Sequence, residues 1–341
     1  MSRIGVLTGG GDCPGLNAVI RAVVGRSVEH NNIEVVGFRN GWAGILDADW
    51  VALDRDSVRG ILGKGGTILG SSRRDPYVHA GGLADMQANL DAAGVDRLIV
   101  IGGDGTLKSA MRLGHEGLNV IGVPKTIDND IAGTDMTFGF DTASQIATDA
   151  IDRITTTAEA HNRVMLVEVM GRTQGWIAIQ AGIAGGADAI LIPEVPYDLS
   201  EIAETVNRRT ERGCNYSLVV VAEGVESPSK NEQELPVDAY GFKRLGGVAY
   251  EIAPLLEDMT GMEARVTVLG YIQRGGTPTS FDRVLATRLG ASAADLAAAR
   301  TTGVMAALRG TDIVAIPLEE ACASTRPVDP RLYDVAKTFF G

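Results

Sequence analysis

The residues with the clearest chemical potential follow an apolar run at residues 98–101. Gly102-Gly103-Asp104-Gly105-Thr106 comes directly after these four β-favouring side chains. Glycine lets the backbone turn sharply and come close to a ligand, because it has no Cβ. A strand, a glycine turn and a helix that begins near Thr106 would together direct backbone N–H groups toward a phosphate. Asp104 would then hold a Mg²⁺ ion that bridges phosphate oxygens, whereas the alternative is an ordinary strand-to-helix turn.

A second turn of the same kind opens the chain. Residues 4–7 are predicted to form a strand and residues 16–24 a helix, and between them stands Thr8-Gly9-Gly10-Gly11-Asp12-Cys13-Pro14-Gly15. The strand, glycine turn and helix recur in the same order, so this stretch is a second candidate phosphate site.

Two carboxylates stand two residues apart in Pro124-Lys125-Thr126-Ile127-Asp128-Asn129-Asp130, after a strand predicted at residues 120–123. As a general base, Asp128 would take the proton from an attacking hydroxyl, and Lys125 would offset phosphate charge. Asp130 would fix a substrate hydroxyl or shape the field around Asp128. The alternative interpretation is a turn with exposed acidic side chains.

Basic side chains gather near predicted strand ends although the chain carries a formal net charge of −12. Residues 65–74 form a loop of small residues that ends in two arginines, and it is either a solvated turn or a means of bringing an arginine to a phosphate. This distribution predicts a compact, highly phosphorylated ligand. The candidate cationic ligands are Arg73, Lys125, Arg163, Arg172, Arg265 and Arg274.

Strands alternate with helices along the whole chain, and the informative residues fall at the carboxyl ends of strands. This order predicts a doubly wound α/β fold with mainly parallel sheets and ligands bound beyond the strand ends. The length of 341 residues favours two domains. Further strands are predicted at residues 33–38, 164–169, 189–192, 218–222 and 266–271. Further helices are predicted at residues 55–62, 83–93, 142–158 (capped by Asp141 or Thr142), 249–257 and 284–299.

Composition excludes several classes of partner. The acidic balance argues against binding to nucleic acid or to an anionic membrane. Three scattered cysteines fit a reduced, cytoplasmic protein, and no apolar run suits a signal peptide or a membrane span. The four histidines show no metal-ligand spacing. Residues 226–244 are polar without clear periodicity, so they are expected to form a lid-like excursion.

Taken together, these motifs resemble the 6-phosphofructokinase family over essentially the whole chain. The resemblance rests on the opening glycine turn, residues 102–106, residues 124–130, Met170-Gly171-Arg172 and Gly270-Tyr271-Ile272-Gln273-Arg274-Gly275-Gly276. It implies transfer of a phosphoryl group to the 1-hydroxyl of fructose 6-phosphate, which is a step of glycolysis, with Mg²⁺ as cofactor. An NAD kinase or a lipid kinase would share only the glycine turn.

The resemblance also implies a role for each matching residue. Asp128 is the base, Asp104 is the Mg²⁺ anchor, and Arg172 is also catalytic because it stabilises charge on the transferring group. The donor site is implied to comprise Gly11, Arg73, Gly103, Asp104, Gly105, Thr106 and Lys125. The sugar-phosphate site is implied to comprise Thr126, Asp128, Asp130, Arg163, Met170, Gly171, Arg172, Glu223, Arg265, Tyr271 and Arg274.

The family architecture implies two domains with the active site in the cleft between them. Residues 1–139 with 273–323 would bind the phosphoryl donor, and residues 140–272 with 324–341 would bind the sugar phosphate. Arg163 and Arg265 match residues that reach the site from a neighbouring subunit, which implies a homotetramer or a homodimer.

Several positions depart from the family's common patterns. Gly105 matches nucleotide-using members, whereas Lys125 matches pyrophosphate-using members; because an aspartate at position 105 would occupy the space of an α-phosphate, we expect ATP, with pyrophosphate as the alternative. Tyr271 stands where bacterial enzymes have histidine near the 6-phosphate, and a phenol still donates one hydrogen bond.

Two further hypotheses concern regulation and function. Arg21 and Arg55 match arginines of the bacterial effector site, but Gly25, Thr155 and Cys214 replace cationic residues there. We therefore expect ADP activation and phosphoenolpyruvate inhibition to be weak or absent. A non-catalytic sugar-phosphate sensor on the same fold is the alternative to a kinase, although base, metal anchor and arginines are all present.

Overall fold

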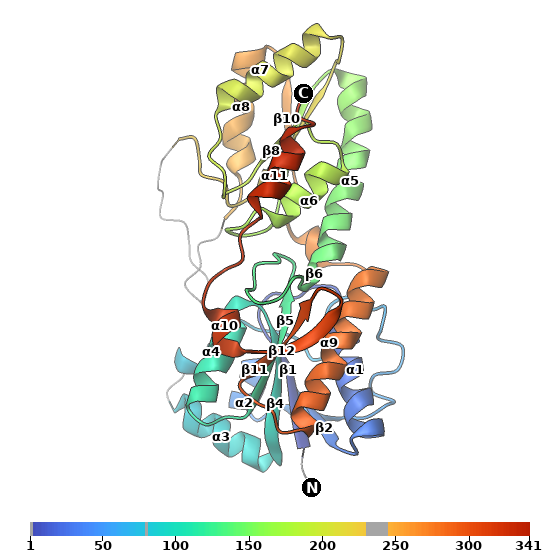
Figure 1. The fold of residues 1–341 in the computed structure, drawn as a ribbon, viewed down its shortest axis with the longest axis vertical. Coiled ribbons are helices and arrows are strands. Elements are labelled where there is room, and N and C mark those ends of the chain that lie inside the picture. The colour runs from blue at the N-terminus through green and yellow to red at the C-terminus, as the bar shows by residue number, and fades with distance from the viewer. Residues whose placement is uncertain (1–2, 79–80, 230–244) are drawn as a thin grey trace. The chain divides into compact units, whose positions relative to one another are not determined.

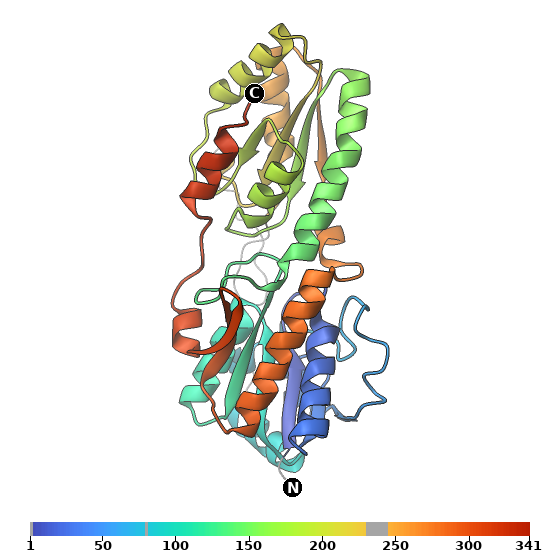
Figure 2. The same cartoon turned by 45° about the vertical axis from the view of Figure 1, so that its right-hand side comes forward.

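Runs of β-favouring apolar residues form two separate, mainly parallel sheets, as Figures 1 and 2 show. The computed structural model describes residues 3–78, 81–229 and 245–341. The described residues fall into two units, the first built from residues 3–142 and Arg274–Thr325, and the second from residues 143–229, 245–273 and Arg326–Gly341. The predicted α/β architecture with parallel sheets is therefore confirmed, whereas the assignment of donor and sugar to the two units stays a prediction.

The sheet of the first unit follows the order β12-β11-β5-β4-β1-β2-β3, with a short β6 paired to β5. All neighbouring strands are parallel except the antiparallel edge pairs β2–β3 and β11–β12. The strands are β1 (Arg3–Thr8), β2 (Glu34–Phe38), β3 (Trp50–Leu53), β4 (Val95–Gly102), β5 (Val120–Thr126), β6 (Phe138–Gly139), β11 (Val304–Arg309) and β12 (Asp312–Pro317).

Helices cover both faces of this sheet. On one face α1 (Leu16–Gly25) and α9 (Ser280–Ala298) lie side by side, and Gly290 permits their close approach, since a Cβ there would lie 2.7 Å from the Val19 carbonyl oxygen. The core of the other face joins the strands to α2 (Trp42–Leu46), α3 (Gly82–Ala92), α4 (Asp104–His115) and α10 (Leu318–Cys322).

The second unit has a four-stranded, fully parallel sheet of order β10-β7-β9-β8. Its strands are β7 (Val164–Val169), β8 (Ala189–Leu191), β9 (Ser217–Ala222) and β10 (Ala264–Val268). Most of α5 (Phe140–His161) belongs to this unit, together with α6 (Trp176–Ala184), α7 (Leu199–Glu211), α8 (Val248–Thr260) and α11 (Pro330–Lys337). No helix of the described residues is both long enough and apolar enough to cross a bilayer.

Three sequence predictions of local structure are wrong. The helix predicted at residues 55–62 is a series of turns, because Gly60 adopts a φ of +74° and only Val58 and Ile61 there are buried hydrophobics. The strand predicted at residues 266–271 ends at Val268, since Gly270 has a φ of +52° and begins a short 3₁₀ helix.

The third error concerns the start of α5. This helix begins at Phe140, so Asp141 and Thr142 lie in its first turn and do not precede it as caps. Most of the predicted excursion at residues 226–244 lies outside the described residues, which end at 229 and resume at 245.

Asp282 of α9 accepts hydrogen bonds from the residues around the start of α5. This fully buried carboxylate accepts hydrogen bonds from the Gly139 N–H at 2.9 Å, from the Thr142 N–H at 2.8 Å and from the Thr142 hydroxyl at 2.5 Å. Burial raises the pKa of Asp282 to about 6 although the three donors lower it. The folded protein therefore holds a proton on Asp282 at pH values where the unfolded chain has already lost it.

The free energy of unfolding contributed by Asp282 is consequently expected to fall as the pH rises from 4 to 6. A shift from 3.8 to about 6 corresponds to no more than about 3 kcal/mol. Urea unfolding at pH 4.5 and pH 7 should show the wild type gaining stability relative to Asp282→Asn at the lower pH. Asp312→Asn, at an exposed aspartate, is the matched control, and an Asp282→Asn difference that is equal at both pH values would contradict the expectation.

Candidate active site

The two glycine turns lie side by side at the carboxyl edge of the first unit's sheet. Strands β1 and β4 are parallel neighbours with Thr8 opposite Ile101, and the Gly9 N–H donates to the Ile101 carbonyl at 2.9 Å. The chain continues from β1 to β2 on one side and from β4 to β5 on the other. This is the kind of switch point at which α/β sheets bind ligands.

The loop at residues 65–74 is an ordered part of this region. The Gly10 N–H donates to the Ser72 carbonyl at 3.1 Å, and the Ser71 hydroxyl donates to the Gly10 carbonyl at 2.5 Å. The Thr8 hydroxyl donates to the Gly70 carbonyl at 2.7 Å. These contacts anchor the segment that carries Arg73 beside the first glycine turn, so the solvated-turn interpretation does not describe it.

Crowding explains two of the glycines of the second turn. A Cβ at Gly102 would lie 2.3 Å from the Cβ of Thr106, and one at Gly103 would lie 3.2 Å from the Lys125 carbonyl oxygen. Helix α4 begins at Asp104, two residues earlier than expected, and no side chain of the described residues caps it. The N–H groups of its first turn therefore stay available for an anion.

Asp104 already carries a cationic partner. Its carboxylate oxygens lie 2.9 and 3.0 Å from the Lys108 ammonium, one turn further along α4. Sequence reasoning missed Lys108, although the spacing of four residues between opposite charges on a helix was the available signal.

The side chains around Asp104 can be compared with the ligands that Mg²⁺ requires. Within the described residues there is no group of three or more histidine, cysteine or acidic side chains that could hold a metal ion. Mg²⁺ is commonly held by one or two carboxylates together with phosphate oxygens and water. Asp104 fits that mode, in which the phosphoryl donor supplies most of the other ligands.

Lys125 lies beneath the first glycine turn. It is 4% exposed, and its ammonium donates a hydrogen bond to the Gly11 carbonyl. Arg274 is close to the same glycine, since a Cβ at Gly11 would lie 2.5 Å from Arg274 Nη1. Burial lowers the pKa of Lys125, so an anion bound at this turn would favour its charged form.

Asp128 is buried and held on one side only. The Thr126 hydroxyl accepts from the Asp128 N–H at 3.0 Å and lies 3.2 Å from its Oδ2. The turn is fixed further by Asn129, which has a φ of +52° and accepts from the Thr137 N–H at 3.0 Å. Asp128 Oδ1 is buried and has no hydrogen-bond partner among the described residues, so its capacity to accept a hydrogen bond is unused.

The first unit thus contains eleven of the sequence-predicted site residues, Asp130 among them as a side chain only 3% exposed. They are Gly11, Arg73, Gly103, Asp104, Gly105, Thr106, Lys125, Thr126, Asp128, Asp130 and Arg274.

In the second unit the carboxyl end of β7 is tied to Glu223. The Gly171 and Arg172 N–H groups both donate to Glu223 Oε1, at 3.3 and 2.9 Å. Arg172 has a φ of +55°, which is uncommon for a residue with a side chain and is typical of functional sites. The Met170 N–H donates to the fully buried Gln273 at 3.3 Å.

A cavity of about 360 Å³ opens beside these residues. The buried Glu168 joins its walls, because its carboxylate accepts from the Gly247 N–H at 2.7 Å and the Ala249 N–H at 2.9 Å, while its carbonyl accepts from the Leu269 N–H at 3.0 Å. Glu168 was not predicted. The lining includes the predicted residues Met170, Glu223 and Tyr271, and also Gly246, Gly247 and Tyr250.

Two predicted phosphate ligands lie at the other end of the same sheet. Arg163 immediately precedes β7 and Arg265 is the second residue of β10, opposite Met165. Met170 and Tyr271 follow the carboxyl ends of these strands, and six residues of strand span about 20 Å. The structure therefore does not bring Arg163 and Arg265 together with Met170, Arg172, Glu223 and Tyr271 of the same chain.

A further cavity, of about 710 Å³, lies in the first unit between α1, α9 and the turns at residues 55–60. Arg21, Gly25 and Arg55, three of the positions compared with the effector site, line it. Thr155 and Cys214 belong to the second unit. The expectation of weak effector control stays a prediction.

Backbone N–H groups at a helix start, a buried lysine and a carboxylate with an open oxygen form the set of groups that a phosphoryl-transfer enzyme uses. The sequence profile of the Phosphofructokinase family matches residues 3–297. The chain is 54% identical over 341 residues to the pyrophosphate–fructose 6-phosphate 1-phosphotransferase of Amycolatopsis methanolica, covering 99% of this chain and 100% of that relative.

The name of a second relative specifies a different phosphoryl donor. The chain is 52% identical over 343 residues to the ATP-dependent 6-phosphofructokinase of Mycobacterium tuberculosis, again covering 99% of this chain and 100% of the relative. A solved phosphofructokinase from Saccharomyces cerevisiae matches with a TM-score of 0.83 and 32% identity, over 99% of this chain and 47% of the yeast chain. The chain belongs to the phosphofructokinase family.

The contact between Thr126 and Asp128 leads to a prediction. Thr126→Val removes the hydroxyl that orients Asp128 while keeping the side-chain volume, so kcat for fructose 6-phosphate phosphorylation is expected to fall about tenfold. Thr126→Ser is the control and should retain most of the activity. Steady-state kinetics of the three proteins decide it, and a valine variant as fast as wild type would exclude an orienting role.

Proposed function

We propose that this protein transfers the γ-phosphoryl group of ATP to the 1-hydroxyl of fructose 6-phosphate and so forms fructose 1,6-bisphosphate. The observation that carries the proposal is the buried, unpartnered Oδ1 of Asp128, next to the two glycine turns in the described part of the first unit. A carboxylate oxygen without a donor matches the needs of an incoming hydroxyl.

In the proposed reaction Asp128 takes the proton of the 1-hydroxyl as that oxygen attacks the phosphorus. Thr126 holds the other carboxylate oxygen in place. Lys125 and the N–H groups at the start of α4 bind the phosphates of the donor, Arg274 belongs to the sugar-phosphate site, and Arg172 stabilises the charge on the transferring group. Mg²⁺ bound by Asp104 would neutralise phosphate charge, and the remaining contribution is positioning.

The choice of ATP rests on Gly105. By the family resemblance, an aspartate at this position would occupy the space that an α-phosphate needs and would repel it. Lys125 is compatible with either donor, because its ammonium is directed to the Gly11 carbonyl beneath the other turn. Pyrophosphate stays the second candidate donor, supported by Lys125 and by the name of the Amycolatopsis relative.

The proposed 6-phosphate site requires a second copy of the chain. Arg163 and Arg265 lie at the amino-terminal end of strands whose carboxyl ends carry Met170 and Tyr271. We therefore assign these two arginines to the site of a neighbouring subunit, in a homodimer or homotetramer. Met170, Gly171, Glu223 and Tyr271 contact the sugar phosphate within the subunit, where Thr126 and Asp130 also face the sugar.

The donor assignment predicts fructose 1,6-bisphosphate formation from fructose 6-phosphate, Mg²⁺ and ATP, with little from pyrophosphate. Gly105→Asp is expected to lower kcat/KM for ATP at least tenfold, and Asp128→Ala should abolish turnover with either donor. Coupled assays with each donor separately provide the measurement. Turnover mainly with pyrophosphate would show that Lys125 sets the donor, and no turnover with either would favour a sugar-phosphate sensor.

The role of Tyr271 gives a second prediction. Its phenol is expected to donate one hydrogen bond to the 6-phosphate, so Tyr271→Phe should raise KM for fructose 6-phosphate about two- to tenfold without changing KM for the donor. Tyr250→Phe, in the lining of the same cavity, removes a hydroxyl to which no role is assigned. Equal KM values for wild type and Tyr271→Phe would show that the phenol does not contact the 6-phosphate.

A further inference from the structure

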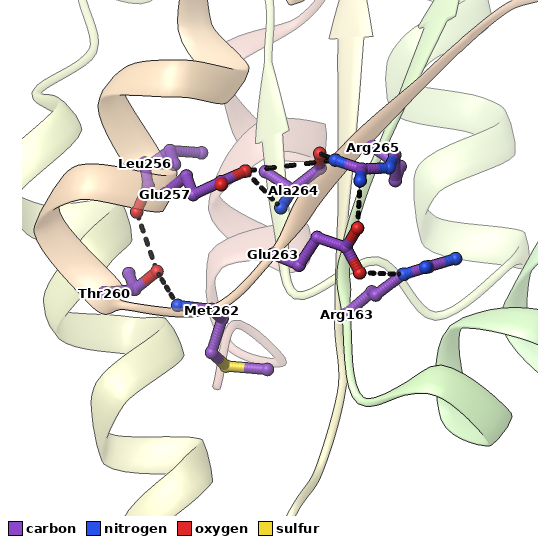
Figure 3. Close-up of polar contacts among 8 residues, drawn as sticks. All are labelled: Arg163, Leu256, Glu257, Thr260, Met262, Glu263, Ala264 and Arg265. Atoms are coloured by element: carbon purple, nitrogen blue, oxygen red, sulfur yellow. Dashed lines mark hydrogen bonds and ion pairs between the residues drawn. The ribbon is translucent and has the colours of Figure 1, made fainter.

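One carboxylate bridges the two arginines that are assigned to the neighbouring subunit's phosphate. Glu263 Oε2 accepts from Arg163 Nε at 2.5 Å, and Glu263 Oε1 accepts from the terminal nitrogen Nη2 of Arg265. Figure 3 shows Glu263 between the two guanidinium groups, with both of its oxygens engaged.

The strand register places the three side chains together. Arg265 is opposite Met165 and Ala264 is opposite Val164 in the parallel pair β10–β7. Since side chains alternate along a strand, Arg163 and Arg265 share one face of the sheet. The backbone adds a fixed point, because the Val164 N–H donates to the Glu263 carbonyl at 3.0 Å.

A second acidic residue supports the same arrangement from α8. Glu257 accepts from the Ala264 N–H at 3.0 Å and lies 4.0 Å from Arg265, whose Nη1 also donates to the Ala264 carbonyl at 2.9 Å (Figure 3). Arg265 is thus held at several points, whereas the contact of Arg163 with Glu263 uses only its Nε. Among the described residues no contact engages all the N–H groups of either guanidinium ion, so N–H groups of both are left over for a further anion.

The exposure of the cluster argues against a role in stability. The side chains of Arg163, Glu263 and Arg265 are 29%, 37% and 51% exposed, and exposed ion pairs contribute little to the folded state. The same pairs do fix two long side chains that would otherwise repel each other and sample many rotamers. The hydrogen bond from Arg163 also lowers the pKa of Glu263, so the bridge persists at neutral pH.

We propose that Glu263 is a positioning residue that holds Arg163 and Arg265 as one preformed receptor for the 6-phosphate of fructose 6-phosphate bound to the neighbouring subunit. The inference rests on the proposed function, because it takes the two arginines as phosphate ligands. A receptor ordered in advance binds more tightly, since the ordering cost of both side chains is met before the ligand arrives.

The test compares Glu263→Ala in the wild-type chain and in an Arg163→Ala/Arg265→Ala chain, using the full-length assembled protein. In the wild-type background KM for fructose 6-phosphate is expected to rise about tenfold, with kcat and the donor KM within twofold. In the arginine-free background Glu263→Ala should change KM by less than twofold, because Glu263 acts only through the arginines. Glu204→Ala, at an exposed glutamate on α7, is the matched control.

The following results would contradict the proposal. A lower KM in Glu263→Ala would mean that Glu263 competes with the phosphate, and an equal effect in both backgrounds would mean that it acts on the fold. If Arg163→Ala/Arg265→Ala had the wild-type KM for fructose 6-phosphate, the two arginines would not be phosphate ligands, although the proposed kinase reaction would still hold. If wild type turns over neither donor, the proposed function fails, and calorimetric binding of fructose 6-phosphate by the same variants then decides on Glu263.

Discussion

The structure depends above all on the parallel pairing of β1 with β4. Thr8 lies opposite Ile101, so the two strands end at the same level and their glycine turns emerge together. The two turns approach so closely that a Cβ at Gly9 would meet the Thr106 side chain at 2.7 Å. The buried ammonium of Lys125 then lies at one turn, and α4 begins at the other.

Much of this arrangement was predictable from local sequence. The strands before the glycine turns and the helices α1, α3 and α9 follow from apolar runs and glycines. Helix α6 was missed because Gln180 is its one polar residue, so the segment shows no polar face at helical spacing. Helix α7 begins with an Asp198 cap that accepts from the Ser200 N–H at 2.8 Å, a signal present in the sequence and overlooked.

Other features depend on contacts that no local pattern encodes. Lys108 and Glu168 are ordinary charged residues of a helix and a strand until the fold places one against Asp104 and the other against the first N–H groups of α8. Glu263 is also unremarkable in sequence, and its position between two arginines requires the β7–β10 register. Motifs therefore pointed to the groups that are proposed to do chemistry, whereas the charged groups in contact with them emerged only with the fold.

The separation of Arg163 and Arg265 from Met170 along one sheet has a genetic consequence. On the proposed assignment, a defect in the arginine pair impairs the active site of the neighbouring subunit. It does not impair the active site that contains Asp128 of the same subunit. As pure populations, subunits with damaged arginines would bind fructose 6-phosphate poorly, and subunits with a damaged Asp128 would not turn it over. In a mixed oligomer, some active sites would combine intact arginines with an intact Asp128, so two defective alleles would complement each other.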